Sequence, residues 1–218
     1  MARVVRSGWW VCFALQVVIA FGLVATPGHA QSALDCFGED NERRFTGCSD
    51  IITAPGTGPD ELATAYAMRA LGYSLKGLYD MALPDYDKAL SINPDFAVAL
   101  NNRAWAFFKS GRASQGLIDV EKSLALAPLS PHTFDTRAHI RQAMGNPGGA
   151  IADYETAMRL GGERMIKLYQ CGLQANGLYD GKVDGIYTRP MREAMEACVR
   201  NSSCDPLPPD EECRASTS

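Results

Sequence analysis

The chain has 218 residues, of which 21 are Lys or Arg and 25 are Asp or Glu, so its formal net charge is −4. An acidic chain does not favour partners that are held by positive charge, which argues against nucleic acid and against an anionic membrane surface. The length suits one or two domains.

Residues 1–30 have the pattern of a secretory signal. Arg3 and Arg6 precede an apolar run of 17 residues from Trp9 to Ala25, and small residues lead to a junction after Ala30. We expect cleavage there and export, to the periplasm of a Gram-negative bacterium. The alternative is a retained anchor, although the run is shorter than the ~20 residues that a membrane span prefers. After cleavage we expect no contact with a membrane.

Residues 31–62 are predicted to form an N-terminal cap. The stretch Cys48–Ile52 has the same pattern as Tyr86–Leu90, which lies in the second helix of the unit described next. We therefore expect one helix that covers the open edge of the following array, as terminal units of arrays do. A Cys36–Cys48 disulfide is expected to attach an extended lead-in to this helix.

Residues 63–164 consist of one 34-residue unit written three times, at 63–96, 97–130 and 131–164. A fixed period of this length indicates a stacked repeat array. Three positions are identical in all copies: Arg69, Arg103 and Arg137; Gly77, Gly111 and Gly145; and Asp85, Asp119 and Asp153. The spacing of small, aromatic and terminal Pro residues resembles the tetratricopeptide repeat.

Each copy of the unit contains two apolar runs of helical period, separated by its invariant glycine. In the first copy these runs are Leu62–Lys76 and Tyr79–Ile92. The glycine stands where the first helix must end and turn, a position that favours a left-handed backbone. The prediction is an all-α fold, an α-solenoid of three helical hairpins, in which the periodic Arg and Asp residues pair between helices.

The first helices of the units line the concave surface in arrays of the family that the repeats resemble. The resemblance and helical spacing predict a partner groove formed by Leu71, Asn101, Asn102, Trp105, Phe108, His132, Asp135 and His139. An aromatic patch flanked by hydrogen-bonding groups suits a peptide segment or a partner helix. The alternative is that Trp105 or Phe108 packs between neighbouring repeats.

The histidines of the third copy allow a second interpretation. His132, Asp135 and His139 fall near one helical face, so a metal site or an acid–base pair is conceivable. The spacing is weak support for either, and we expect polar groups on a solvated groove, with no metal and no cofactor.

Residues 165–213 are predicted to form a second, smaller helical unit. Its order of helix, turn-rich loop and helix resembles the peptidoglycan-binding domain of bacterial wall proteins, most specifically at Val183–Tyr187. The resemblance implies a possible glycan-binding loop with Tyr179, Asp184, Gly185 and Tyr187. Residues 214–218 are expected to form a disordered tail.

Six cysteines follow the signal segment, and an even number in an exported chain indicates disulfides. Clustering predicts the pair Cys36–Cys48. The packing of two helices in the resembled domain implies Cys171–Cys198, which leaves Cys204–Cys213. Zinc is the alternative, but no C-x-x-C spacing occurs.

The junction at Gly161-Gly162 could be a hinge between the two units. Beyond it, Met165, Ile166, Leu168 and Tyr169 form an apolar stripe that is too wide for a helix with a single buried face. We expect this helix to cover the last repeat on one side and to belong to the small unit on the other, as one rigid body.

No Gly-x-Ser-x-Gly, His-Glu-x-x-His or phosphate-loop motif is present, so we expect no enzyme. The predicted function is that of an exported scaffold whose groove binds a protein or peptide segment of the cell envelope. The alternative is a peptidoglycan-binding accessory protein in which the repeats act as a spacer.

Overall fold

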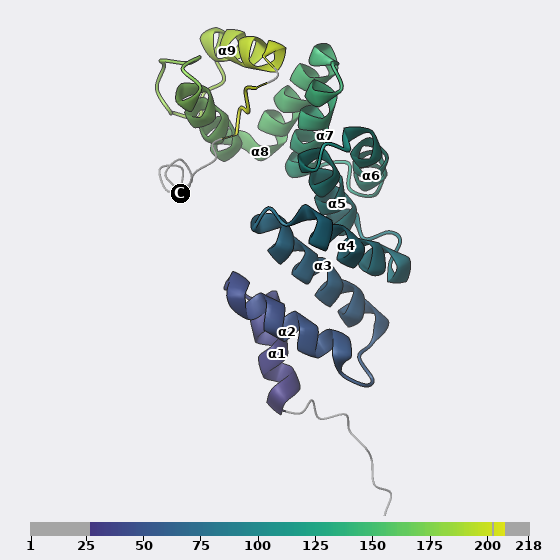
Figure 1. Ribbon diagram of the computed structural model, residues 1–218. Helices are drawn as coiled ribbons and strands as arrows, with labels where there is room; N and C mark the ends of the chain where they lie inside the picture. Colours follow the sequence, from purple (N-terminus) through teal and green to yellow (C-terminus); the bar gives the residue numbers. More distant parts are fainter. Residues whose placement is uncertain (1–26, 202, 208–218) are drawn as a thin grey trace, which may run out of the picture.

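The computed structural model describes residues 27–201 and 203–207, and within these residues the chain contains nine helices and no strand (Figure 1). The helices are α1 (Pro27–Phe37), α2 (Asn41–Thr53), α3 (Pro59–Leu75), α4 (Tyr79–Ile92), α5 (Ala97–Lys109), α6 (Ala113–Leu126), α7 (Pro131–Ala143), α8 (Pro147–Ala175) and α9 (Arg189–Arg200). Most of the predicted signal segment, residues 1–26, and the predicted tail, residues 214–218, lie outside the described residues. No helix within the described part is long and apolar enough to cross a bilayer.

The three repeats form three helical hairpins, α3–α4, α5–α6 and α7 with the first half of α8. Each hairpin turns at the predicted glycine, with φ of 73° at Gly77, 77° at Gly111 and 72° at Gly145. The structure thus confirms the α-solenoid, and each helix packs on its neighbours in a curved row (Figure 1). Small side chains let the two helices of a hairpin approach closely: a Cβ at Gly116 would stand 2.7 Å from the carbonyl oxygen of Ala104.

The periodic charges pair between the two helices of each hairpin, as predicted. In the middle repeat, Arg103 donates from Nε and Nη2 to the two carboxylate oxygens of Asp119, at 2.6 and 2.8 Å. The same two-bond pairing joins Arg69 to Asp85 and Arg137 to Asp153. Arg103 also donates to Asp87 of the preceding repeat, so this arginine joins two neighbouring hairpins.

The N-terminal region differs from the single cap helix and extended lead-in that the sequence predicts. Residues 27–37 form the helix α1, which pairs with α2 as a fourth hairpin, and α2 packs on α3 as expected of a cap. A disulfide joins Cys36 of α1 to Cys48 of α2, in the expected pairing. Both cysteines are fully buried, so the disulfide stands in the middle of the hairpin contact.

The C-terminal unit continues directly from the third repeat. The helix α8 changes direction at Gly162, where φ is 64° and ψ is −153°, and then runs on to Ala175. One hydrophobic core extends across this kink, from Tyr154 and Met158 of the repeat to Met165, Tyr169 and residues of α9. The shared core agrees with the predicted rigid junction.

Two of the predicted disulfides are wrong. Cys198 is bonded to Cys204 and not to Cys171, because the chain turns back after α9 and brings the Cα atoms of Cys198 and Cys204 to 5.2 Å. Cys204 is therefore not available to Cys213, which lies outside the described residues. Cys171 is disulfide-bonded as well.

Candidate functional site

The open part of the concave face is centred on an aromatic pair in α5. The rings of Trp105 and Phe108 lie 5.2 Å apart, and the ammonium group of Lys109 stands 5.4 Å from the Trp105 ring and 5.9 Å from the Phe108 ring. Both aromatic side chains are half-buried. This arrangement forms a partly exposed apolar surface with a positive charge at its edge.

Polar groups of the predicted groove lie one turn away on α5. Asn101 and Asn102 are half-buried, and the Asn101 amide nitrogen donates to the Asn102 side-chain oxygen at 3.4 Å. The Asn101 side-chain oxygen is buried and accepts no hydrogen bond from the described residues. Buried acceptors are usually paired, so this oxygen is an exception in the interior of α5. Leu71 of α3 is also half-buried.

The third-repeat end of the predicted groove is not open, which corrects the sequence-based expectation. Asp135 is 7% exposed and His139 is 4% exposed. The physical reason is that Tyr169, from the second half of α8, donates a hydrogen bond to the Asp135 carboxylate and covers it. His132 remains exposed and lines a separate cavity of about 240 Å³ with Arg164 and Leu168.

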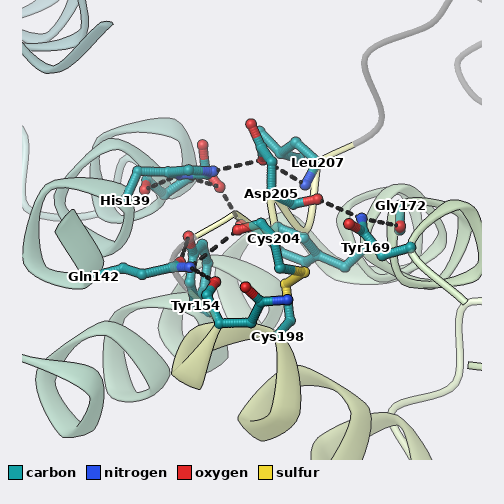
Figure 2. A network of polar contacts seen from close by, with 12 residues as sticks. His139, Gln142, Tyr154, Tyr169, Gly172, Cys198, Cys204, Asp205 and Leu207 are labelled. Atoms are coloured by element: carbon teal, nitrogen blue, oxygen red, sulfur yellow. Dashed lines mark hydrogen bonds and ion pairs between the residues drawn. A yellow bond between two sulfur atoms is a disulfide. The ribbon is translucent and has the colours of Figure 1, made fainter. Parts of the chain in front are cut away.

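His139 is covered by the segment after α9, which we call the C-terminal strap (residues 203–207). Its Nε2 lies 3.0 Å from a carboxylate oxygen of Asp205, and its Nδ1 lies 2.9 Å from the backbone oxygen of Asp135 (Figure 2). Gln142 donates to the backbone oxygen of Cys204 at 3.0 Å and accepts from the Tyr154 hydroxyl at 3.1 Å. The strap thus occupies the concave face of the third repeat.

Aromatic rings connect the open and the covered parts of the concave face. The His139 ring lies 5.2 Å from Trp105, 5.7 Å from Phe108 and 5.2 Å from Tyr154. Trp105 and Phe108 therefore both contact the next repeat, as the alternative interpretation predicts, while each keeps part of its side chain exposed to solvent. A cavity of about 210 Å³ between Phe108, His139, Gln142 and the strap continues the groove.

The electrostatics of His139 are set by the two carboxylates beside it. Burial favours the neutral imidazole, but Asp135 and Asp205 outweigh burial and raise the pKa of His139 above its ordinary value. Burial raises the pKa of Asp135. Burial also acts to raise the pKa of Asp205, but its hydrogen bond to His139 and the charge of the imidazole lower it overall. The site therefore favours an imidazolium–carboxylate pair between the repeat and the strap.

The described residues contain no cluster of three or more His, Cys, Asp or Glu side chains placed to hold a metal ion. His132 is exposed at the start of α7, whereas His139 is turned into the core, so the two histidines do not share a site.

The proposed glycan-binding loop uses its polar groups internally. The buried side chain of Gln170 accepts from the backbone nitrogens of Asp184 and Gly185 and donates to the Asp184 carboxylate at 2.9 Å. Tyr187 donates to Glu155 at 2.8 Å, and Tyr179 donates to the Lys182 backbone oxygen at 3.3 Å. Gly185 is buried with φ of 77°. These contacts attach the loop to α8.

Sequence reasoning missed the strap and two of the residues that position it, Asn176 and Asp205. A partial signal exists, because Gln142 is on the groove face of its helix by the same spacing as His139. Nothing in the repeat period indicates that Asp205 returns to the third repeat from 66 residues away.

Comparisons with known proteins support the repeat assignment. Residues 63–96 match the family model described as "Tetratricopeptide repeat". The chain is 31% identical over 106 residues to "Tetratricopeptide repeat protein 13" of Homo sapiens and 31% identical over 105 residues to "Tetratricopeptide repeat protein 36" of Bos taurus. It is 28% identical over 133 residues to "RNA polymerase II-associated protein 3" of Xenopus laevis.

These alignments cover only part of each protein. They include 46%, 46% and 59% of this chain, and 12%, 56% and 20% of the three relatives in the order given. The similarity therefore supports a tetratricopeptide-repeat array, and it does not extend to the whole of any of these relatives.

Proposed function

We propose that this tetratricopeptide-repeat protein is a non-enzymatic scaffold that binds a peptide segment of another protein on its concave face. The observation that carries the proposal is the half-buried pair Trp105 and Phe108, which lies beside Lys109 and one turn from the half-buried Asn101 and Asn102. Aromatic anchors surrounded by hydrogen-bonding groups are typical of protein-binding hot spots.

Partner capture by the purified protein tests this proposal. The double variant Trp105→Ala/Phe108→Ala is expected to lose most of the proteins that the parent protein retains from envelope extracts. The matched control is Ile118→Ala. Ile118 lies on α6 and is 72% exposed, so this substitution removes apolar surface outside the aromatic pair. Equal capture by both variants, with circular dichroism showing that both are folded, would reject the aromatic pair as the binding site.

Export to the cell envelope is part of the proposal. It is supported by the sequence pattern of residues 1–30 and by the disulfides Cys36–Cys48 and Cys198–Cys204, which persist in oxidising compartments. The predicted cleavage after Ala30 falls within α1, where His29 lies 2.9 Å from Glu61. The mass of the protein isolated from its native cells shows whether cleavage occurs there, upstream, or not at all.

Peptidoglycan binding is the alternative, and it is supported by the sequence resemblance of the Val183–Tyr187 loop. The internal hydrogen bonds of that loop favour a structural role for it. Co-sedimentation with purified peptidoglycan decides between the two functions: retention that is lost in Tyr187→Ala and kept in Trp105→Ala/Phe108→Ala would favour the glycan-binding alternative.

A further inference from the structure

The C-terminal strap has the features of a bound peptide. It follows α9 without helical structure and crosses the concave side of α7. Three side chains address it in the manner of a peptide-binding groove: Gln142 donates to the Cys204 backbone oxygen at 3.0 Å, Asn176 donates to the Asp205 backbone oxygen at 2.8 Å, and His139 pairs with the Asp205 carboxylate at 3.0 Å (Figure 2). Contacts to backbone oxygens hold any extended chain, and the contact to the carboxylate selects for an acidic residue.

Apolar contacts complete the surface on which the strap lies, which we call its seat. Pro206 is among the fully buried side chains of the molecule, and Leu207 packs against the core that the third repeat shares with the C-terminal unit. The Asp205 side chain, in contrast, is 46% exposed. The contacts of these residues therefore match an acidic residue followed by proline and an aliphatic residue, and the charged contact remains accessible to solvent.

From these contacts we propose that the third-repeat end of the concave face is a binding site for an extended Asp-Pro-aliphatic segment, and that the strap occupies this site within the same chain. A partner protein carrying such a segment would compete with the strap for His139, Gln142 and Asn176. This inference deepens the proposed function and rests on it, since it names the chemistry of a partner segment for the same concave face.

Two further observations support a partner of this chemistry. Lys109 carries a positive charge that acts on Asp205, so the seat attracts a carboxylate although the whole chain is acidic. The cavity between Phe108, His139 and the strap joins the seat to the aromatic pair, so that one extended segment can contact both. The Cys198–Cys204 disulfide keeps the strap next to its seat, and a tethered ligand of this kind acts at an effective concentration of the order of millimolar.

A synthetic peptide supplied to the whole protein tests the inference. The probe is fluorescein-labelled Asn-Ser-Ser-Ser-Asp-Pro-Leu-Pro-Pro, which copies residues 201–209 with Ser in place of Cys204. The opened protein is the full chain with Cys198→Ser, Cys204→Ser and Asp205→Ala, which removes the Cys198–Cys204 disulfide and the charged contact of the strap. Fluorescence polarisation is expected to show saturable binding to the opened protein, and binding at least 10-fold weaker to the parent protein.

Side-chain controls define the site. Gln142→Ala in the opened protein, or Asn in place of Asp in the peptide, is expected to weaken binding at least 10-fold. Gln115→Ala, which removes the same side chain from an exposed position on α6, is expected to leave it unchanged. If the opened protein does not unfold cooperatively, the variant Asp205→Asn, which keeps the disulfide, takes its place and the same ranking is required.

The possible failures are distinguishable. No binding to a folded opened protein, or equal binding to the opened and the parent protein, overturns this inference. If Trp105→Ala/Phe108→Ala loses partner capture and the peptide does not bind the opened protein, the proposed function stands and this inference is rejected. Peptide binding with unchanged partner capture in that double variant rejects the aromatic pair as the binding site and leaves this inference standing.

Discussion

The repeated Arg–Asp pairs contribute to stability because the carboxylates are buried. The Asp119 side chain is 7% exposed and that of its partner Arg103 is 20% exposed, so removing the arginine leaves a carboxylate that water reaches poorly. Exposed pairs contribute little by comparison. The periodic charges are therefore part of the hairpin core and not part of the solvated surface.

Arg103→Met is expected to lower the free energy of unfolding by about 3 kcal/mol, because it strands the buried Asp119 carboxylate. The double variant Arg103→Met/Asp119→Leu should recover part of this loss, since it removes both charges. Urea denaturation measures both, with Arg189→Met as the control: Arg189 and its partner Glu193 are 88% and 61% exposed, and its loss should be under ~1 kcal/mol. Equal losses for Arg103→Met and the control would contradict the assignment.

The pKa of His139 predicts a pH dependence of stability. The folded-state pKa of His139 is raised above the unfolded value of about 6.5 by Asp135 and Asp205. Its contribution to stability is therefore complete below about pH 6.5 and is lost as the pH rises through the folded-state pKa. The free energy of unfolding should fall as the pH rises above about 6.5 in the parent protein and fall less in His139→Gln. A His139→Gln slope equal to the parent's would refute the pairing.

At the scale of single elements, the sequence period accounts for the repeat hairpins and their turns. The invariant glycine marks the position where only a left-handed backbone lets the second helix fold back on the first. Gly111 has φ of 77°, and a Cβ at that position would meet no atom within 4 Å, so the backbone conformation and not crowding requires glycine.

Gly111→Ala should therefore lower the free energy of unfolding by about 1–2 kcal/mol, the cost of a left-handed residue with a Cβ. Gly148→Ala is the matched control, because Gly148 lies in the first turn of α8 with no positive φ and open space around its Cβ position. That variant should be neutral or more stable by up to ~1 kcal/mol. Thermal or urea unfolding compares them, and equal stability of the two variants would remove the proposed role of the turn.

Other elements could not be assigned from the period. The helix α1 begins at Pro27, within residues that have the composition of a signal-peptide junction, so the sequence pattern there indicates targeting and not a helix of the array. The spacing of the two cysteines nevertheless indicates a hairpin. Cys36 and Cys48 are 12 residues apart, the same separation as the small residues Ala70 and Ala82 of the first repeat. The disulfide occupies the position where small residues meet in that hairpin.

At the scale of the whole molecule, the sequence predicts the local hairpins well, but it does not predict that the C-terminal residues cover the third repeat. Trp105 and Phe108 follow the repeat pattern and are half-buried against His139 of the next repeat, and their role in a partner groove stays a prediction. Asp135 and His139 follow the same pattern, but Tyr169 and Asp205 cover them, and these residues come from parts of the chain that lack the period. The Cys171–Cys198 prediction failed for a related reason, since it assumed the helix packing of a resembled domain and not the return of the chain after α9.

The junction at Gly161-Gly162 gives the last prediction. A hinge needs two bodies with separate cores, whereas one core here runs from Tyr154 to Met195 across the kink, and Tyr169 binds Asp135 of the third repeat. Separation would expose that core and strand the Asp135 carboxylate, so the third repeat and the C-terminal unit should unfold together.

Limited trypsin digestion tests this rigid junction. Arg164 and Lys182 are both exposed, but Arg164 lies in a helix that must open before a protease can bind it, whereas Lys182 lies in the loop before α9. We expect cleavage at Lys182 first and slow cleavage at Arg164 that follows global unfolding. Rapid cleavage at Arg164 that releases two folded fragments would show a hinge, and it would also separate His139 from the strap, because the strap would leave with the C-terminal fragment.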